Sequence, residues 1–497
     1  MIPVALAEVA AATGGRLDGG ADPAALVTSV VVDSRLVAPG ALFVALPGER
    51  ADGHDFAPGA AAAGAVAVLA ARPVGVPAVL VADPAAGLIA LAGHVRTLAK
   101  AAVLAVTGSS GKTTTKDLLA DLVGTLGPTI APPGSFNNEV GLPLTLLRLE
   151  ESTEYAVLEM GARGVGHIAA LCAIAQPHVG LVLNVGSAHV GEYPEGRAGI
   201  AQAKGELAEA ATDTVVLNAD DPLVAAMRSR AAGRVVTFGL DPGADVRAEQ
   251  VALDQAGRAS FDLLAGGERH RVRLTLVGGH QVGNALAAAA GAVAVGMTPA
   301  AAAEALTAAR PRSRWRMEVT TAPSGLVVVN DAYNANPESM RAALRALVGL
   351  GGAAPAPASG LAGGHASGGH ASGGSTGDGG GGRRRTWAVL GPMAELGVFA
   401  DDEHAELGRF AAELGIDRVL AVGPDARPLA AAAAAAGAQV DWVGDVGAAG
   451  GWLAAAGLGA ADVVLVKASR AYGLERLARA LMEPGAGGDD PSGSLDR

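Results

Sequence analysis

The chain of 497 residues has little cysteine, few aromatic side chains and no excess of positive charge. Its single cysteine, Cys172, excludes an intramolecular disulfide, so we expect a small buried residue in a protein from a reducing compartment. Aromatic residues make up 3% of a chain that is 50% hydrophobic, which predicts cores built mainly from small aliphatic side chains. The net charge of −12 argues against a general affinity for nucleic acid, whose phosphates require a basic surface.

The sequence also shows no clear pattern of a secretory signal or a membrane span. The N-terminal apolar stretch has no basic residue before it and contains Glu8, unlike a signal peptide. The uncharged window from Ala285 to Ala303 is long enough to cross a bilayer, but Thr298-Pro299 divides it into two shorter helical pieces. We therefore expect buried helices there, and a cytoplasmic protein without membrane insertion.

Short apolar runs alternate with Ala- and Leu-rich helical stretches along most of the chain. The runs are continuous, as expected for parallel strands that helices cover on both faces. At roughly 150 residues per domain, this pattern predicts about three stacked α/β domains. Residues 244–276 instead alternate between polar and apolar around Gly266-Gly267, which predicts an antiparallel hairpin at a sheet edge.

The segment 351–382 is composed almost entirely of small residues and contains the sequence GGHAS twice. It has too few large apolar residues to offset the entropy of ordering, so we predict a disordered loop between a helix at 338–348 and a strand at 386–390. We interpret its two histidines as spacer residues rather than a metal site. The stretch from Pro484 onward is predicted to be disordered as well.

The sharpest motif is a loop between a predicted strand at 103–106 and a predicted helix. It consists of Thr107, Gly108, Ser109, Ser110, Gly111, Lys112, Thr113 and Thr114. Glycines let a backbone wrap around a phosphate, lysine supplies charge for the β- and γ-phosphates, and a neighbouring hydroxyl can hold Mg²⁺. The loop is a shortened variant, because Val106 stands where a further glycine is usual. The order of strand, loop and helix predicts an ATP- or GTP-binding domain.

Three further residues could complete a nucleotide and metal site. Glu159 and His189 each follow a predicted strand, whereas Lys204 lies in a predicted helix. Ligands bind at the carboxyl ends of parallel strands, and carboxylates and imidazoles are common metal ligands. Plainer interpretations stay open: Glu159 as a helix cap, His189 as a satisfied structural residue and Lys204 as part of a solvated helix face.

A dense polar cluster, Asp331, Asn334 and Asn336, lies between a predicted strand and a predicted helix. A plain turn needs only one such side chain, so this density predicts a binding loop. The segments MAELG at 393–397 and VKASR at 466–470 also follow predicted strands.

Nine segments, in order and over nearly the whole chain, resemble those of the Mur ligase family: TGSSGKTTT, FNNEVGLPLTLL, VLEMGARG, QAKGEL, GGHQVGNALAAA, SRWRMEV, NDAYNANPESM, MAELG and VKASR. The stretch from Val30 to Phe56 is similar to the UDP-binding domain of the later ligases of that pathway. The chain departs from the common pattern at Gln281, at Pro392 and in the glycine-rich insertion.

The resemblance implies an α/β protein of three domains. A UDP-sugar-peptide binding domain is expected at 1–99, and a P-loop ATP-binding domain with a parallel sheet at 100–312. A Rossmann-like domain at 313–497 would close over both and carry the insertion at about 351–385.

The resemblance also assigns roles at the metal site. Thr113 and Glu159 would hold one Mg²⁺, and His189 would help to hold a second. Lys204 matches a lysine that the family carbamylates, which would convert a cation into a carboxylate-like metal ligand. Together with Lys112 and Arg316, His189 and Lys204 form the expected catalytic set.

The remaining assignments implied by the resemblance concern the nucleotide and the substrates. Asn284 would face the adenine, Arg316 the γ-phosphate and Asp331 the ribose. The residues expected to bind the other substrates are Asp33, Ser34, Arg35, Asn137, Asn138, Asn334, Asn336, Ser469 and Arg470, of which the first three match a motif that faces the uridine.

The activity that the resemblance implies is ATP-dependent amide ligation. The DAYNANP loop favours an enzyme that joins D-alanyl-D-alanine to UDP-N-acetylmuramoyl-tripeptide through an acyl phosphate, for peptidoglycan synthesis. We expect this enzyme to be a monomer. One alternative is another ligase of the superfamily, acting on a different muramyl peptide or on folate. A second alternative is a non-catalytic nucleotide-binding scaffold. The presence of every candidate residue for phosphate and metal binding argues against it.

Overall fold

The computed structural model describes residues 1–48, 51–352 and 383–483. The predictions made for the glycine-rich insertion and for the stretch from Pro484 onward lie outside the described residues. Three main sheets follow one another along the chain, within residues 16–80, 102–277 and 318–467. The predicted domain boundaries near residues 99 and 312 fall between these sheets and stay predictions.

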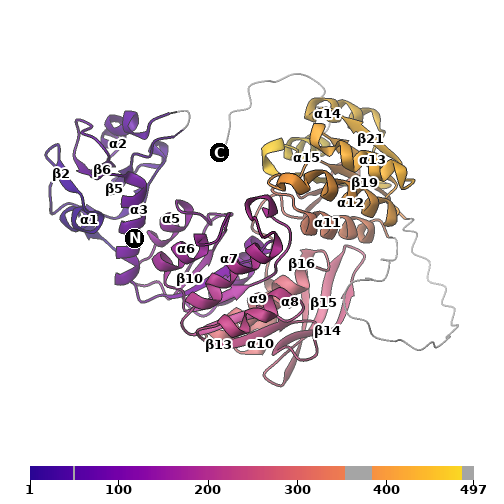
Figure 1. Ribbon diagram of the computed structural model, residues 1–497, viewed down its shortest axis with the longest axis horizontal. Helices are drawn as coiled ribbons and strands as arrows, with labels where there is room; N and C mark the ends of the chain where they lie inside the picture. The colour runs from indigo at the N-terminus through magenta and orange to yellow at the C-terminus, as the bar shows by residue number, and fades with distance from the viewer. Residues whose placement is uncertain (49–50, 353–382, 484–497) are drawn as a thin grey trace.

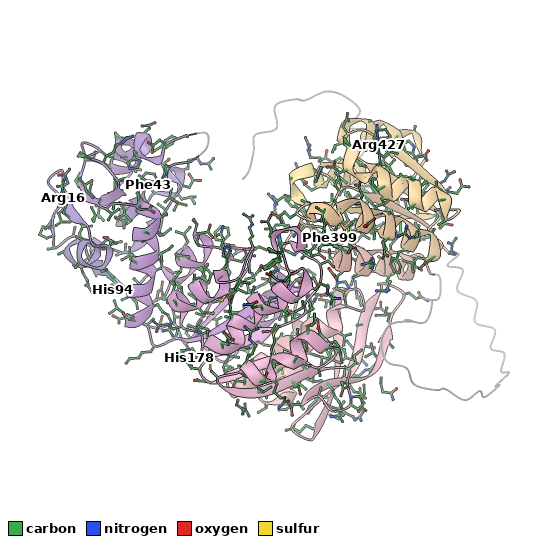
Figure 2. The ribbon with its side chains drawn as sticks, viewed as in Figure 1. Arg16, Phe43, His94, His178, Phe399 and Arg427 are labelled. Atoms are coloured by element: carbon green, nitrogen blue, oxygen red, sulfur yellow. The ribbon has the colours of Figure 1, made fainter. Side chains whose placement is uncertain are left out.

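The first domain contains a five-stranded sheet in the order β2-β7-β6-β5-β4, in which only the edge strand β2 is antiparallel to its neighbour. The strands are β2 (Arg16–Asp18), β4 (Ser29–Val31), β5 (Ala41–Val44), β6 (Ala67–Ala70) and β7 (Ala78–Leu80). The helices are α1 (Leu6–Thr13), α2 (Ala57–Ala62) and α3 (Pro84–Leu98). Phe43 on β5 is one of the largest fully buried side chains of the molecule (Figure 2).

The central domain contains a nine-stranded sheet in the order β16-β15-β14-β13-β12-β11-β8-β10-β9. The strands are β8 (Ala102–Thr107), β9 (Thr129–Ile130), β10 (Tyr155–Glu159), β11 (Val179–Val182), β12 (Thr214–Asn218), β13 (Arg234–Gly239), β14 (Val246–Leu253), β15 (Arg258–Ala265) and β16 (Glu268–Val277). The pairings from β9 to β14 are parallel, and β14 to β16 form an antiparallel edge. The hairpin predicted around Gly266-Gly267 is confirmed, as the turn between β15 and β16.

Helices cover both faces of the central sheet. They include α4 (Lys112–Val123), α5 (Gly141–Leu146), α6 (His167–Ala175), α7 (Arg197–Ala210), α9 (Gln281–Ala294) and α10 (Pro299–Ala308). The division of the window 285–303 into two helices is confirmed, and Thr298 caps the second of them. The small residues let the helices lie close to the strands: a methyl group at Gly291 on α9 would meet Leu119 and Leu181 at 3.0–3.4 Å. In the described part of the chain, no helix combines the length and the apolar character needed to cross a membrane.

The third domain contains a six-stranded sheet in the order β17-β18-β22-β19-β20-β21, parallel except for β17. The strands are β17 (Glu318–Thr321), β18 (Val327–Asn330), β19 (Arg385–Leu390), β20 (Arg418–Val422), β21 (Val440–Val443) and β22 (Asp462–Lys467). Its helices are α11 (Pro337–Leu350), α12 (Ala400–Glu413), α13 (Arg427–Ala435), α14 (Val446–Ala455) and α15 (Glu475–Met482). The predicted three-domain α/β fold is confirmed.

The first and third domains lie at opposite ends of the central domain (Figure 1). Arg96 near the end of α3 joins the first domain to the central one, because its guanidinium donates to the carbonyl oxygens of Ala175 and Gln176 at the C-terminal end of α6. The third domain contacts the central one through the start of α11 and through the loop before α12, where Phe399 lies at the junction (Figure 2).

Candidate active site

A cavity of about 1190 Å³ lies where the domains meet. Its lining comes from the loop before α4, the ends of several central strands, α6, α7 and α9, the start of α11 and one residue of α3, Ile89. This is the carboxyl edge of the central parallel sheet, where open α/β sheets bind ligands.

The predicted phosphate loop connects β8 to α4 in the expected way. Gly111 has a φ of +80°, and a methyl group there would lie 2.3 Å from Asn284 Oδ1, so only glycine fits this turn. No side chain of the described residues caps α4, which leaves its first amides available to an anion. Lys112 Nζ donates to the carbonyl oxygen of Gly108 at 2.7 Å, and burial lowers the pKa of this lysine.

One side of the phosphate loop carries a carboxylate and hydroxyl groups. Glu159 ends β10 and is 1% exposed; its Oε2 accepts from Thr113 Oγ1 at 2.7 Å, and its Oε1 accepts from Asn137 Nδ2 at 2.7 Å. Ser135 Oγ contacts Thr113 Oγ1 at 2.7 Å and accepts from Arg316 Nη2 at 2.7 Å. Glu159 is therefore not a helix cap, and this group presents hard oxygen donors beside two cations, Lys112 and Arg316.

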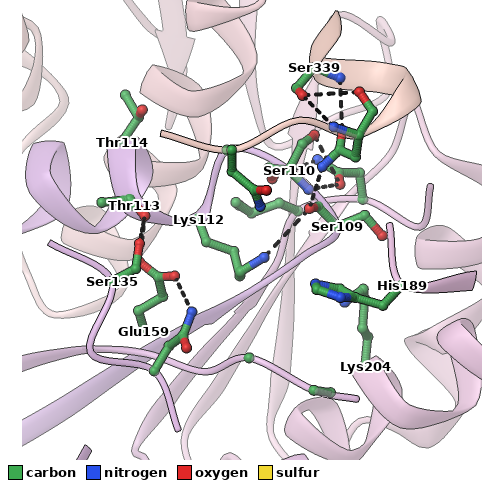
Figure 3. A pocket seen from close by; sticks show the side chains of 18 of the residues that line it. Ser109, Ser110, Lys112, Thr113, Thr114, Ser135, Glu159, His189, Lys204 and Ser339 are labelled. Carbon is green, nitrogen blue, oxygen red and sulfur yellow. Dashed lines mark hydrogen bonds between the residues drawn. The ribbon is translucent and has the colours of Figure 1, made fainter. Parts of the chain in front are cut away.

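The other side carries His189 and Lys204, which lie next to each other and across Lys112 from Glu159 (Figure 3). His189 has a φ of +60°, and its Nδ1 lies 2.5 Å from Oε2 of Glu395 in the third domain. Burial lowers the pKa of His189 and outweighs the opposing effect of the Glu395 carboxylate.

Lys204 is 4% exposed, so the interpretation as part of a solvated helix face is wrong. Its Nζ has no hydrogen-bond or ion-pair partner among the described residues. Burial holds its pKa well below the usual range, and the charge of Lys112 lowers it further. Glu206, two residues later on α7, accepts from the amides of Gly166 and Ala169 at the start of α6, which anchors α7 beside the site.

The third domain adds a second set of polar groups. Asp331 accepts from the Met317 amide at 2.9 Å, and its Oδ2 lies 2.6 Å from Lys467 Nζ. Asn336 caps α11 and donates from Nδ2 to the Ser109 carbonyl oxygen at 3.4 Å. The guanidinium of Arg316 lies over the ring of Tyr333, 4.1 Å from its centroid.

Most of the residues predicted from sequence come together in this cavity. Those that line it are Ser109, Ser110, Gly111, Lys112, Thr113, Thr114, Asn137, Asn138, Glu159, His189, Lys204, Asn284, Arg316, Asp331, Asn334 and Asn336. Thr107 and Gly108 precede the lining residues of the same loop, and Thr107 Oγ1 donates to the Met160 carbonyl oxygen. Thr115 Oγ1 and Gln281 Oε1 hold the Asn284 amide against the loop.

The other predicted residues do not line the cavity. Ser469 is buried, and its Oγ accepts from the Ala394 amide at 2.9 Å, while Arg470 is exposed over the Trp315 ring. Asp33, Ser34 and Arg35 form a turn after β4 in the first domain, in which the Asp33 carboxylate accepts from the Arg35 backbone and side chain. If this turn binds one end of a substrate that reacts in the cavity, that substrate must extend from the first domain to the cavity.

Sequence reasoning missed several lining or paired residues: Ser135, Asn184, Tyr333, Glu338, Glu395 and Lys467. Glu338, Glu395 and Lys467 lie in segments that resemble those of the family and that follow predicted strands, so the sequence could have indicated these three residues. Nothing in the sequence indicated Ser135 or Asn184, although Asn184 accepts from the Ser110 amide at 2.9 Å and donates to the Ser110 carbonyl oxygen at 3.1 Å.

The described residues contain no group of three His, Cys, Asp or Glu side chains that could hold a metal ion. Glu159 and His189 lie on different sides of Lys112, so each would need additional donors (Figure 3). Thr113 supplies an oxygen on the Glu159 side, and a carbamate on Lys204 would supply one on the His189 side. The unmodified chain thus fits Mg²⁺ better beside Glu159 than beside His189.

Comparisons with known proteins agree with this arrangement. Models of the Mur ligase family match at residues 26–92 (catalytic domain), 106–292 (middle domain) and 370–470 (glutamate ligase domain). The UDP-N-acetylmuramoyl-tripeptide–D-alanyl-D-alanine ligase of Mycobacterium tuberculosis is 45% identical over 100% of both chains. A crystal structure of MurF from Acinetobacter baumannii has a TM-score of 0.82 and 31% identity, over 97% of this chain and 99% of that one. MurF from Thermotoga maritima in complex with ADP has a TM-score of 0.74 and 29% identity, over 92% and 97%.

Proposed function

The chain belongs to the Mur ligase family, and we propose that it joins D-alanyl-D-alanine to UDP-N-acetylmuramoyl-tripeptide with the hydrolysis of ATP to ADP and phosphate. The product is the UDP-N-acetylmuramoyl-pentapeptide from which peptidoglycan is made. The observation that carries this proposal is the single cavity that combines the phosphate loop of the central domain with the polar loop at 331–338 of the third.

The first step activates the terminal carboxylate of the tripeptide. A carboxylate is a poor electrophile, so it first attacks the γ-phosphorus of ATP, which gives an acyl phosphate and ADP. Phosphoryl transfer depends mainly on positioning and on neutralising charge. The amides at the start of α4 would bind the phosphates, and Lys112 and Arg316, which line the same cavity, would neutralise their charge.

Mg²⁺ belongs to the same proposal. Thr113 and Glu159 would hold one ion and His189 with Lys204 would help to hold a second, and bound Mg²⁺ supplies charge neutralisation at the transferring phosphoryl group. Ser135 and Asn137 orient the first pair of ligands, since they bond to Thr113 and Glu159.

We also propose that Lys204 is carbamylated. Burial and the neighbouring charge of Lys112 hold the pKa of this amine well below its usual range, which favours the neutral form that can add to carbon dioxide with the release of a proton. The resulting carbamate would place negative charge between His189 and Lys112. Incubation with ¹³C-bicarbonate should yield a carbamate carbon signal in the wild type that Lys204→Met abolishes.

The second step forms the amide bond. The amine of D-alanyl-D-alanine attacks the acyl phosphate carbon, and the tetrahedral intermediate expels phosphate. No nucleophilic side chain of the protein is needed. Asn336 and Glu338 bring the third domain against the phosphate loop and the loop before His189, which limits the access of water to the acyl phosphate.

The test is phosphate release by the purified chain with Mg-ATP, UDP-N-acetylmuramoyl-tripeptide and D-alanyl-D-alanine, with each component omitted in turn. We expect release that requires both acceptors, together with the pentapeptide product by mass spectrometry. Release with a different amine or acid would change the substrate assignment, and no release with any combination would favour a scaffold. The monomeric state and the cytoplasmic location stay predictions.

A further inference from the structure

The cavity is rich in positive charge, but one of the reactants is itself a cation. Lys112 and Arg316 suit the phosphates of ATP and the carboxylate of the tripeptide. The incoming dipeptide carries an α-ammonium group at neutral pH, which these cations repel. To bind this ammonium group, the site needs a carboxylate oxygen that is not already engaged in a hydrogen bond.

Four carboxylates line the cavity: Glu139, Glu159, Asp331 and Glu338. Both oxygens of Glu159 accept hydrogen bonds, and those of Asp331 bind the Met317 amide and Lys467. Glu139 is exposed to solvent, where an ion pair is worth little. These three are therefore poor candidates for holding an ammonium group.

Glu338, in the first turn of α11, differs from the other three. Its Oε1 accepts from the Ser187 amide at 2.7 Å, which fixes the carboxylate against the central domain. Its Oε2 is buried and has no hydrogen-bond partner among the described residues. A buried carboxylate oxygen without a donor is costly, so this atom is suited to a donor that arrives with a ligand.

The position of Glu338 also suits the joining reaction. Ser187 follows Gly186, whose amide donates to Ser109 Oγ of the phosphate loop at 2.9 Å. Asn336 donates to the Ser109 carbonyl oxygen from the third domain. Ser339, the next residue of α11, lines the same cavity as Ser109 and Ser110 (Figure 3). The unpartnered oxygen thus belongs to a residue that lines the cavity next to the loop that would hold the transferred phosphate.

We propose that Oε2 of Glu338 binds the α-ammonium group of the incoming dipeptide. This assignment rests on the proposed function and adds the residue that recognises the amine substrate. It also makes recognition depend on docking of the third domain, because the carboxylate is oriented by Ser187 across the interface. A methyl group at Gly186 would lie 2.4 Å from the Glu338 carboxyl carbon, so the glycine is what leaves room for the carboxylate.

The test compares two nucleophiles that attack the same acyl phosphate. D-alanyl-D-alanine carries an ammonium group, whereas hydroxylamine is mainly uncharged at neutral pH and gives a hydroxamate. Glu338→Gln keeps the shape and an acceptor for Ser187 but loses the charge. We expect the apparent KM for D-alanyl-D-alanine to rise about 10- to 100-fold, with hydroxamate formation within about twofold of the wild type.

Glu475 on α15 provides a matched control, because it also has a buried Oε2 without a hydrogen-bond partner among the described residues but does not line the cavity. Glu475→Gln should leave both reactions unchanged. Gly186→Ala displaces the Glu338 carboxylate without removing it, so it should raise the KM for D-alanyl-D-alanine by a smaller factor. This variant serves as the test if Glu338→Gln does not fold.

An equal loss of both reactions in Glu338→Gln, or an unchanged KM, would overturn the proposal in favour of a docking role alone. Failure of the proposed function is visible separately, because wild-type protein would then make no pentapeptide, whether or not it makes hydroxamate.

Discussion

The central and third domains each contribute a buried lysine to the cavity, and the surroundings of the two lysines are opposite. Lys467, at the end of β22, is 2% exposed; its Nζ lies 2.6 Å from Asp331 Oδ2 and donates to the Asn334 carbonyl oxygen at 2.8 Å. Lys204 on α7 is almost as deeply buried but has no partner among the described residues. A buried charge is tolerated when it is paired. We therefore expect the paired lysine to stabilise the third domain and the unpaired one to take part in the chemistry of the site.

Replacing Lys204 gives the largest expected effect. Lys204→Met should lower turnover by about 10²–10³-fold, because it removes a group that we propose to act at the phosphoryl-transfer site. Its free energy of unfolding should stay equal to that of the wild type or rise, because the methionine side chain needs no hydrogen-bond partner. Steady-state phosphate release and urea unfolding measure the two quantities. Lys100→Met, at an exposed position, is the control that should change neither. Full activity in Lys204→Met would remove this lysine from the site.

Replacing Lys467 tests the other half of the comparison. Lys467→Met leaves the Asp331 carboxylate buried without its cation, so the third domain should lose about 3–5 kcal/mol of unfolding free energy. Tryptophan fluorescence during urea unfolding reports this domain, which contains all four tryptophans of the chain: Trp315, Trp387, Trp442 and Trp452. Combining Asp331→Asn with Lys467→Met should recover part of the lost free energy of unfolding. A Lys467→Met protein as stable as the wild type would contradict the structural role.

The contact between the two domains can be disturbed without touching either lysine. A methyl group at Gly191, next to the His189–Glu395 contact, would lie 2.7 Å from the Gly397 amide nitrogen. Gly191→Ala should therefore shift the third domain and lower turnover about tenfold, since small misplacements at reacting groups are costly. Gly451→Ala, on α14 with open space around it, is the matched control. Equal activity of both variants would show that this contact does not position the site.

Cys172 offers the smallest expected effect. It lies in the core on α6, where burial raises the pKa of its thiol to about 12. The native thiol should therefore resist alkylation at pH 8, where it carries almost no thiolate, and unfolding in urea should expose it. Cys172→Ala should leave turnover unchanged and cost about 1 kcal/mol of unfolding free energy. Rapid labelling of native protein would show that α6 opens.

The local sequence determined the elements and the phosphate loop. Continuous apolar runs became parallel strands, and Thr298-Pro299 separated two helices, because backbone sterics and burial of apolar faces act over a few residues. The loop before α4 formed as predicted, since Gly111 adopts a positive φ that other residues avoid. The buried position of Cys172 was likewise predicted correctly.

Only the tertiary structure decided which polar residues meet. The helical pattern around Lys204 resembles a solvated face, and its burial follows from the packing of α7 beside the phosphate loop and α6. Glu338 and Glu395 acquire their partners, Ser187 and His189, across an interface between residues more than a hundred positions apart. Sequence periodicity indicates which face of a single helix or strand is apolar. Whether a charged side chain is buried, and whether it has a partner, depends on the other elements that pack against it. For this reason the sequence predicted the nucleotide-binding loop in detail, while the partners of its charged residues emerged only from the assembled domains.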